Sequence, residues 1–278
     1  MRTEIFVIFD YSGTLSTDAV LFSRPDRLVE ALEKTGLAGL GVTTPDIFWT
    51  EIVNPSWDRG STTGTGYGRL MEECIRERLD PAVPDKRIAE AASRFVTQYL
   101  ENSPIHPRWK PLLQRIAGNE GIRTVVATDH YAEATNYIIG HLKAFGIKAF
   151  PVREGGTRRD GIAVANSADL GAHKADRTFW ETLKRHLPAV PVADVLIVDD
   201  FGFNEGTGDA YSEEAKVETR KAHTTALLED VFSAMVHPVP FMLKDAEKLS
   251  ENDDAVKGIA EKISRTADLI TAILRPEQ

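Results

Sequence analysis

Three short apolar runs constrain the fold of this chain more than any other feature. They are EIFVIF at residues 4 to 9, RTVVAT at 123 to 128 and DVLIVDD at 194 to 200. Each run is continuous, which is typical of a strand covered on both faces of a sheet. Helical patterns at 132 to 147 and 176 to 187 lie between the second and third runs. This alternation predicts an α/β fold with a doubly wound parallel sheet.

The three predicted strands all end in polar side chains. Asp10 follows the first run, Thr128 ends the second, and Asp199 and Asp200 end the third. In open parallel sheets, ligands bind at the carboxyl ends of the strands, in the crevice where the strand order reverses. We therefore predict that these side chains converge on one pocket.

A long helical segment separates the first two predicted strands. Residues 16 to 107 carry helical patterns broken by Gly, Pro and Thr, and this segment is far longer than a crossover needs. We predict an inserted helical domain over 16–107, with 1–15 and 108–278 forming the α/β core. The charged tail after residue 240 has helical spacing and is expected to pack on the core or on a partner subunit, which leaves a homodimer open.

Composition limits the classes of partner. The chain has 278 residues, 42% of them hydrophobic, and a net charge of -9, which argues against nucleic acid as the main partner. The single cysteine, Cys74, fits a reducing compartment. No run approaches the roughly 20 apolar residues of a membrane helix. We expect a cytoplasmic protein that binds a small molecule, without nucleic-acid or membrane partners.

The polar strand ends also form an ordered set of motifs. DYSGT at 10 to 14 is followed by Thr128, then by Lys174 with Asp176 two residues later, then by the acidic VLIVDD run at 195 to 200. In this order the motifs resemble those of the haloacid dehalogenase superfamily of aspartate-nucleophile hydrolases. The helical segment falls where that family inserts its cap domain, and the resemblance implies a Rossmann-like core.

The resemblance implies a phosphoryl-transfer site that contains Mg²⁺. Asp10 would be both nucleophile and metal ligand, Ser12 would offer its main-chain carbonyl, and Asp200 would complete the protein ligands. Asp199 is the less favoured ligand of the acidic pair. A cation is needed because a carboxylate that attacks a phosphoryl group is otherwise repelled by its negative charge.

Other residues are expected to bind the substrate. By the same resemblance, Thr128 and Lys174 would hold the phosphoryl oxygens. Gly13 and Thr14 fit a sharp loop whose main-chain N–H groups stay free to face an anion. Arg59, in a Gly- and Thr-rich segment of the helical insert, is a candidate substrate contact, although that segment is also typical of a plain interhelical loop.

One position departs from the pattern of the family's phosphatases. They carry a second aspartate two residues after the nucleophile, which protonates the leaving alkoxide, and here that position is Ser12. A serine hydroxyl holds its proton too tightly for general acid catalysis near neutral pH. The substitute acid could be His130, His173 or a group from the cap.

Three functions stay open on the sequence. The favoured one is a Mg²⁺-dependent phosphatase that acts on a small phosphorylated metabolite through an aspartyl-phosphate. A second is a reaction whose leaving group needs no proton, as in a dehalogenase or a carbon–phosphorus hydrolase. Against these stand the paired acids, Asp199 and Asp200, and the solvated patterns around the cap lysines Lys34 and Lys86. The third is a catalytically weak protein that binds a phosphorylated ligand.

The acidic fourth motif has its own variation. In many family members a second acid follows the first by four or five residues, and here those positions hold Asn204 and Glu205. Either could orient Lys174 or the waters of the metal, and Glu205 could equally be a solvated residue.

Overall fold

The structure is a computed structural model that describes residues 4–78, 83–154, 160–188, 190–204, 214–243 and 253–274. The strands are β1 (Glu4–Phe9), β2 (Ile122–Thr128), β3 (Ala149–Pro151), β4 (Ile162–Asn166), β5 (Val192–Asp199) and β6 (Met235–Pro240). The helices before β2 are α1 (Asp18–Phe22), α2 (Pro25–Thr35), η1 (Ala38–Leu40), α3 (Pro45–Phe48), η2 (Trp49–Val53), α4 (Asn54–Ser61), α5 (Tyr67–Arg76), α6 (Asp85–Glu101), η3 (Pro107–Trp109) and α7 (Lys110–Ala117). The later helices are α8 (Ala134–Ala144), α9 (Ser167–Leu170), α10 (Arg177–His186), α11 (Glu214–Phe232) and α12 (Asp253–Ile273).

The six strands form one parallel sheet with the order β3-β4-β2-β1-β5-β6. The chain leaves β1 toward β2 on one side and leaves β5 toward β6 on the other, so the strand order reverses between β1 and β5. This switch point is where open α/β sheets bind their ligands. The three predicted strands and the doubly wound parallel sheet are confirmed.

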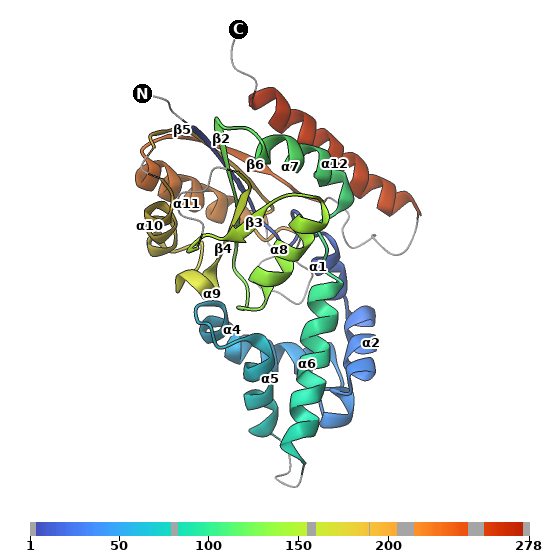
Figure 1. Ribbon diagram of the computed structural model, residues 1–278. Helices are drawn as coiled ribbons and strands as arrows, with labels where there is room; N and C mark the ends of the chain where they lie inside the picture. Colours follow the sequence, from blue (N-terminus) through green and yellow to red (C-terminus); the bar gives the residue numbers. More distant parts are fainter. Residues whose placement is uncertain are drawn as a thin grey trace.

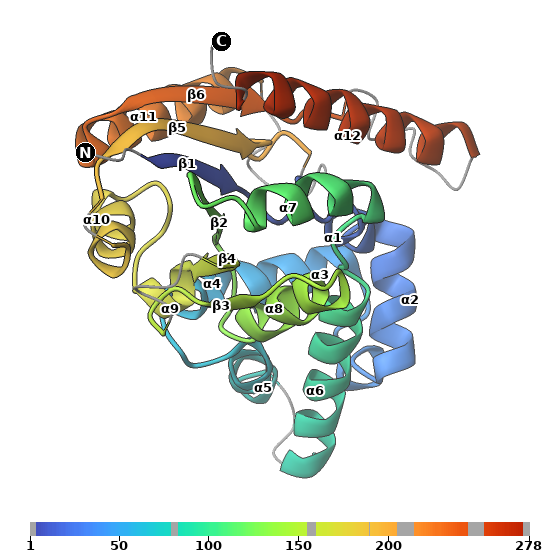
Figure 2. The same cartoon turned by 45° about the horizontal axis from the view of Figure 1, so that its top comes forward.

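Helices cover both faces of the sheet (Figures 1 and 2). On β1, Val7 and Phe9 belong to the core cluster shared with α7, α8 and α12, while Phe6 and Ile8 belong to the cluster shared with α10 and α11. Because successive side chains of a strand point to opposite faces, a strand buried on both sides needs an unbroken apolar run. This explains the continuous pattern of residues 4 to 9.

Strands β3, β4 and β6 were not among the predictions. Strand β6 carries Pro238 and Pro240, which ordinarily argue against a strand. It nevertheless pairs with β5 along its length, and the main-chain N–H of Phe241 continues the ladder by donating to the carbonyl of Asp199 at 3.0 Å. The prolines are accommodated because β6 lies at the edge of the sheet.

The segment between β1 and β2 is helical, and α2, α4, α5 and α6 lie together on one side of the sheet layer (Figure 1). Its buried residues, such as Leu28 and Phe95, belong to the same apolar cluster as Val7 and Phe9 of β1. The division into a cap at 16–107 and a separate core stays a prediction.

Helix α12 packs on the rest of the chain. Ile259, Ile263 and Ile270 are buried in the cluster that covers one face of the sheet. The prediction that the tail packs on the core is confirmed for this helix, and a homodimer stays a prediction. Among the helices in the described ranges, none is both long enough and apolar enough to span a bilayer.

Candidate active site

Three carboxylates meet at the switch point between β1 and β5. One oxygen from each of Asp10, Asp199 and Asp200 lies within 4.8 Å of the others, and all three residues are buried. Asp10 directly follows β1, Asp199 ends β5, and Asp200 is the next residue. The sheet topology therefore brings together the acidic strand ends.

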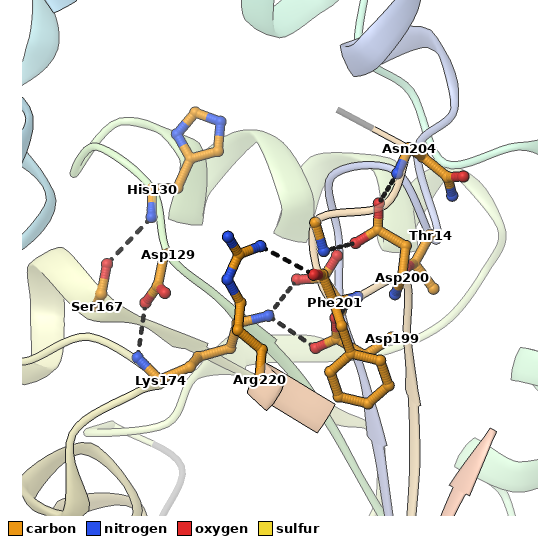
Figure 3. A network of polar contacts seen from close by, with 12 residues as sticks. Thr14, Asp129, His130, Ser167, Lys174, Asp199, Asp200, Phe201, Asn204 and Arg220 are labelled. Carbon is orange, nitrogen blue, oxygen red and sulfur yellow. Dashed lines mark hydrogen bonds and ion pairs between the residues drawn. The ribbon is translucent and has the colours of Figure 1, made fainter. Parts of the chain in front are cut away.

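Lys174 brings an ammonium group to the cluster. Its Nζ donates to Asp10 Oδ1 at 2.6 Å and to Asp199 Oδ2 at 2.9 Å. Both sides of its main chain are fixed, since its N–H donates to Asp129 Oδ1 at 2.9 Å and its carbonyl accepts from Trp180 Nε1 at 2.7 Å. The lysine is thus placed by Asp129, which directly follows β2 (Figure 3), and by Trp180 of α10.

The turn after β5 holds the two acidic side chains in place. The N–H of Phe201 donates to Asp199 Oδ1 at 2.6 Å, and those of Gly202 and Asn204 donate to the two oxygens of Asp200, each at 2.9 Å. Phe201 and Gly202 have positive φ angles of 51° and 75°, so the chain turns back sharply and aims its N–H groups at the carboxylates. Figure 3 shows this arrangement.

Asn204 has a structural role rather than the role of a second acid. Its Nδ2 donates to the carbonyls of Gly13 and Phe241, both at 2.7 Å, and its Oδ1 accepts from the N–H of Leu243 at 2.7 Å. These hydrogen bonds of the carboxamide link three loops at the edge of the site, and none of them involves Lys174. Glu205 lies outside the described residues.

The loop after β1 is closed by its own main chain. The N–H of Gly13 donates to the carbonyl of Ser16 at 2.9 Å, and that of Thr14 donates to the carbonyl of Tyr11 at 3.3 Å. The expectation that these two N–H groups stay free for an anion is therefore wrong. Among residues 10 to 16, the main-chain N–H groups of Tyr11 and Ser12 are those for which the described residues provide no acceptor.

Gly13 and Thr14 connect this loop to the end of β5. Gly13 has a φ of +76°, and a Cβ there would lie 2.4 Å from Asp200 Oδ2, so the position requires glycine. Thr14 Oγ1 accepts from the N–H of Asp200 at 3.1 Å. Both residues shape the site by positioning Asp200.

Thr128 places a hydroxyl at the end of β2, next to β1 in the sheet. The residue is 1% exposed, and in the described part of the chain its Oγ1 has no hydrogen-bond partner. A buried polar atom without a partner costs free energy unless a ligand or water satisfies it. This hydroxyl fits the predicted contact with a phosphoryl oxygen.

The electrostatics of the cluster are dominated by burial and crowded negative charge. Burial, followed by the charges of Asp199 and Asp200, raises the pKa of Asp10 well above its usual value, although Lys174 opposes this shift. Burial and the charge of Asp199 raise the pKa of Asp200 to about 7. Burial alone would lower the pKa of Lys174, but Asp10, Asp199 and Asp129 outweigh it and raise the pKa well above its usual value. The lysine is therefore a permanent cation.

The donor set of the cluster fits a hard divalent cation. Three buried carboxylates offer oxygen ligands of the kind that Mg²⁺ prefers, and one ammonium cannot balance them. Buried charges in excess are costly unless they are paired or bind a metal. Asp10 can be a ligand through Oδ1, because that oxygen accepts one hydrogen bond, from Lys174, within the described residues, and a carboxylate oxygen can take more than one partner.

The two histidines considered as substitute acids both make hydrogen-bond contacts with residues outside the carboxylate cluster. His130 is buried, its Nδ1 accepts from the N–H of Tyr131 at 2.9 Å, and its Nε2 lies 3.1 Å from the Tyr99 hydroxyl. Burial lowers the pKa of His130 to about 4, so the ring is neutral near pH 7. His173 Nε2 lies 2.6 Å from the Ser61 hydroxyl.

Arg59 is not brought to the cluster. Its guanidinium donates to Glu73 of α5 and forms an ion pair with it, and more than half of its side chain is exposed. In this conformation the arginine connects α4 and α5 within the helical segment. Its role as a substrate contact stays a prediction.

Sequence reasoning missed one ionisable residue of the site. Asp129 directly follows β2, and the charges of both Lys174 and Asp199 act on its carboxyl group. A signal was present, since Asp129 is a second polar residue directly after Thr128 at a strand end. The free N–H groups of Tyr11 and Ser12 had no such signal, because side-chain patterns do not encode main-chain direction.

The chain was compared with family models, curated proteins and solved structures. No family model and no curated protein matches the sequence. The crystal structure of 2-haloacid dehalogenase from Pseudomonas syringae pv. Tomato DC3000 is similar to this chain with a TM-score of 0.45 and 17% sequence identity, covering 78% of this chain and 84% of that chain.

Proposed function

We propose that this protein is a Mg²⁺-dependent hydrolase of the haloacid dehalogenase superfamily, and that it acts as a phosphatase on a small phosphorylated metabolite. The observation that carries the proposal is the cluster of three buried carboxylates around one ammonium at the switch point of the sheet. Such an excess of buried acids is costly in a purely structural role, but it suits a site that binds a cation and its anionic substrate.

Asp10 is the nucleophile in this proposal. Its Oδ1 accepts from Lys174, while its Oδ2 accepts no hydrogen bond from the described residues and is available to attack phosphorus. The attack forms an aspartyl-phosphate, which water later hydrolyses. Lys174 offsets the repulsion between the carboxylate and the phosphoryl group, because its ammonium lies against Asp10 and stays charged.

The phosphoryl oxygens have donors of their own. In this proposal the hydroxyl of Thr128 and the N–H groups of Tyr11 and Ser12, which have no partner among the described residues, donate to them. These donors belong to β2 and to the loop after β1, so they are fixed by the sheet before substrate arrives. Fixed donors of this kind stabilise developing negative charge without reorganisation.

Asp10 and Asp200, with Asp199 beside them, would hold the metal ion together with the main-chain carbonyl of Ser12. When bound, Mg²⁺ supplies positive charge that offsets the negative charge of the phosphoryl group in the transition state. That Asp199 is the less favoured ligand of the pair stays a prediction, since each oxygen of Asp199 and of Asp200 accepts one hydrogen bond. A cytoplasmic location remains a prediction.

A substrate panel tests the proposal directly. Phosphate release from p-nitrophenyl phosphate and from a set of sugar and polyol phosphates is measured with Mg²⁺ and with EDTA. We expect turnover that requires Mg²⁺. Halide release from 2-haloacids in EDTA would instead identify a dehalogenase, and stabilisation of the fold by phosphorylated compounds without turnover would identify a binding protein.

A further inference from the structure

The proposed reaction lacks a proton donor at position 12, two residues after the nucleophile, where the chain has a serine. When a phosphate ester is cleaved, its alcohol leaves as an alkoxide unless a general acid protonates the ester oxygen. Ser12 cannot supply that proton. His130 cannot supply it either, because its ring is neutral and both nitrogens are engaged. His173 is held by Ser61 and stacks on Trp57, with the ring centroids 6.3 Å apart.

One further carboxyl group lies on the same edge of the sheet. Residues Phe9 and Val126 are the last paired residues of β1 and β2, and Ser12 and Asp129 each lie three residues beyond this pair. Asp129 therefore carries, on the neighbouring strand, the acidic group that Ser12 lacks. In Figure 3 it lies beside the main-chain end of Lys174, while Asp199 lies beside the ammonium end.

The hydrogen bonding of Asp129 leaves one of its oxygens available. Oδ1 accepts from the N–H of Lys174 at 2.9 Å, and no donor among the described residues reaches Oδ2. Asp129 is partly buried directly after β2. A protonated carboxyl would fit these contacts, with Oδ1 as the carbonyl acceptor and the proton on Oδ2.

We propose that Asp129 is the general acid and base of the reaction, in place of the residue missing at position 12. This inference rests on the proposed phosphatase function. Desolvation raises the pKa of Asp129, although the ammonium and the N–H of Lys174 oppose the shift. A raised pKa favours the acid form that a proton donor needs.

The two steps balance with Asp129 in this role. Asp10 Oδ2 bonds to phosphorus, the bond from phosphorus to the ester oxygen breaks, and that oxygen keeps the electron pair and takes the proton of Asp129. The alcohol leaves. Asp129, now a carboxylate, takes a proton from water as the water oxygen bonds to phosphorus and the bond to Asp10 breaks. Inorganic phosphate leaves and both carboxyl groups return to their first state.

The test compares leaving groups in the variant Asp129→Asn. Asparagine keeps the oxygen that accepts from Lys174, so the lysine stays in place, but it cannot transfer a proton. With the best sugar phosphate of the panel, whose alkoxide needs a proton, we expect single-turnover cleavage to slow by about 10²- to 10³-fold. With p-nitrophenyl phosphate, whose leaving group needs little protonation, we expect a burst of p-nitrophenolate near the wild-type rate.

The second step gives an independent readout. Because the same variant lacks the base that activates water, the aspartyl-phosphate should accumulate after the burst, and it is detected by mass spectrometry of the quenched protein. Asp129→Ala, which also removes the acceptor for the N–H of Lys174, should slow both esters. Circular dichroism and thermal unfolding show whether each variant is folded.

The outcomes separate this inference from the function on which it rests. If Asp129→Asn slows both esters by the same factor, Asp129 only positions Lys174, and if it slows neither, Asp129 has no part in the reaction. Either result overturns the inference while the wild-type protein remains a phosphatase. If the wild-type protein cleaves no phosphate ester at all, the proposed function itself has failed.

Discussion

Strand β1 has a buried acid at each of its ends, and the two are balanced very differently. At the amino end, Glu4 is 4% exposed, and its carboxylate accepts from Arg123 Nε at 3.1 Å and forms an ion pair with it. At the carboxyl end, Asp10 is 5% exposed and shares one ammonium with Asp199 and the nearby Asp200. Both ends are equally buried, so burial alone does not distinguish them.

The difference lies in the charge that each end leaves uncompensated. At the amino end the carboxylate of Glu4 lies against a guanidinium, whereas at the carboxyl end three buried carboxylates lie near one ammonium. An excess of buried negative charge destabilises the protein until a cation or a proton arrives. Groups that lower stability in this way persist where function requires them. The imbalance, rather than the acids themselves, marks the carboxyl end as the site.

The strongest test of this contrast is Asp10→Asn. We expect turnover to fall at least about a thousandfold, because the nucleophile is lost. The free energy of unfolding without metal should not fall, because the change removes one of several crowded charges. Phosphate release and urea unfolding measure the two effects. Full activity in this variant would show that Asp10 is not the nucleophile.

A substitution at the amino end of β1 should have the opposite effect, lowering stability without lowering activity. Glu4→Gln removes the carboxylate that pairs with the part-buried Arg123, and we expect the free energy of unfolding to fall by about 3 kcal/mol with kcat unchanged. Glu261→Gln is the matched control, since Glu261 pairs with Arg265 on an exposed face of α12, and it should cost about 0.3 kcal/mol. Equal losses in the two variants, measured by urea unfolding, would contradict the contrast.

His130 sharpens the comparison, because it is a buried ionisable group that stays neutral. Its folded-state pKa is lowered to about 4 from an ordinary value of 6.5, so below pH 6.5 the unfolded chain takes up a proton that the folded chain refuses. Stability should be complete above pH 6.5 and fall as the pH drops toward 4, by about 3 kcal/mol from this group. Urea unfolding of wild type and His130→Gln across this range should show a larger drop in the wild type, because the lowered pKa values of His106 and His141 act on both proteins. Parallel curves would contradict the assignment.

The smallest expected effect is that of the metal on stability. At a free Mg²⁺ concentration ten times its dissociation constant, the folded protein should gain about 1.4 kcal/mol. Thermal unfolding of EDTA-treated protein with and without Mg²⁺ measures this gain, which needs no substrate. Asp200→Asn should abolish it and Glu4→Gln should not. Identical melting temperatures with and without Mg²⁺ in the wild type would contradict the hypothesis that the site at the carboxyl end of β1 binds Mg²⁺.

The sequence predicted the parts of the fold whose apolar pattern is unbroken. Strands β1, β2 and β5 are continuous runs, and the polar residues at their ends could be placed on one edge because parallel strands share it. Strand β4 has an unbroken apolar run of only four residues, IAVA, and strand β6 is interrupted by two prolines. Their pairing depends on neighbours far away in the chain, which a local pattern does not contain.

The site was predictable to the extent that side-chain types carry it. Asp10, Lys174 and Asp200 could be selected because their chemistry is unusual at strand ends. The free N–H groups of the loop after β1 could not, since which of Tyr11, Ser12, Gly13 or Thr14 faces outward is set by the turn itself. Asn204 was considered because it occupies a position where many family members have a second acid. Its contacts with three main-chain groups could not be predicted, because they depend on loops that meet only in the folded chain.

The two prolines of β6 also determine what the edge of the sheet can do. Main-chain N–H groups alternate in direction along a strand, and that of Phe241 points to β5, so those of residues 238 and 240 would point away from the sheet. These two positions are the prolines, which have no N–H. The strand therefore keeps its full pairing with β5 while offering a foreign strand no donor there, which protects the protein against growth of the sheet into aggregates.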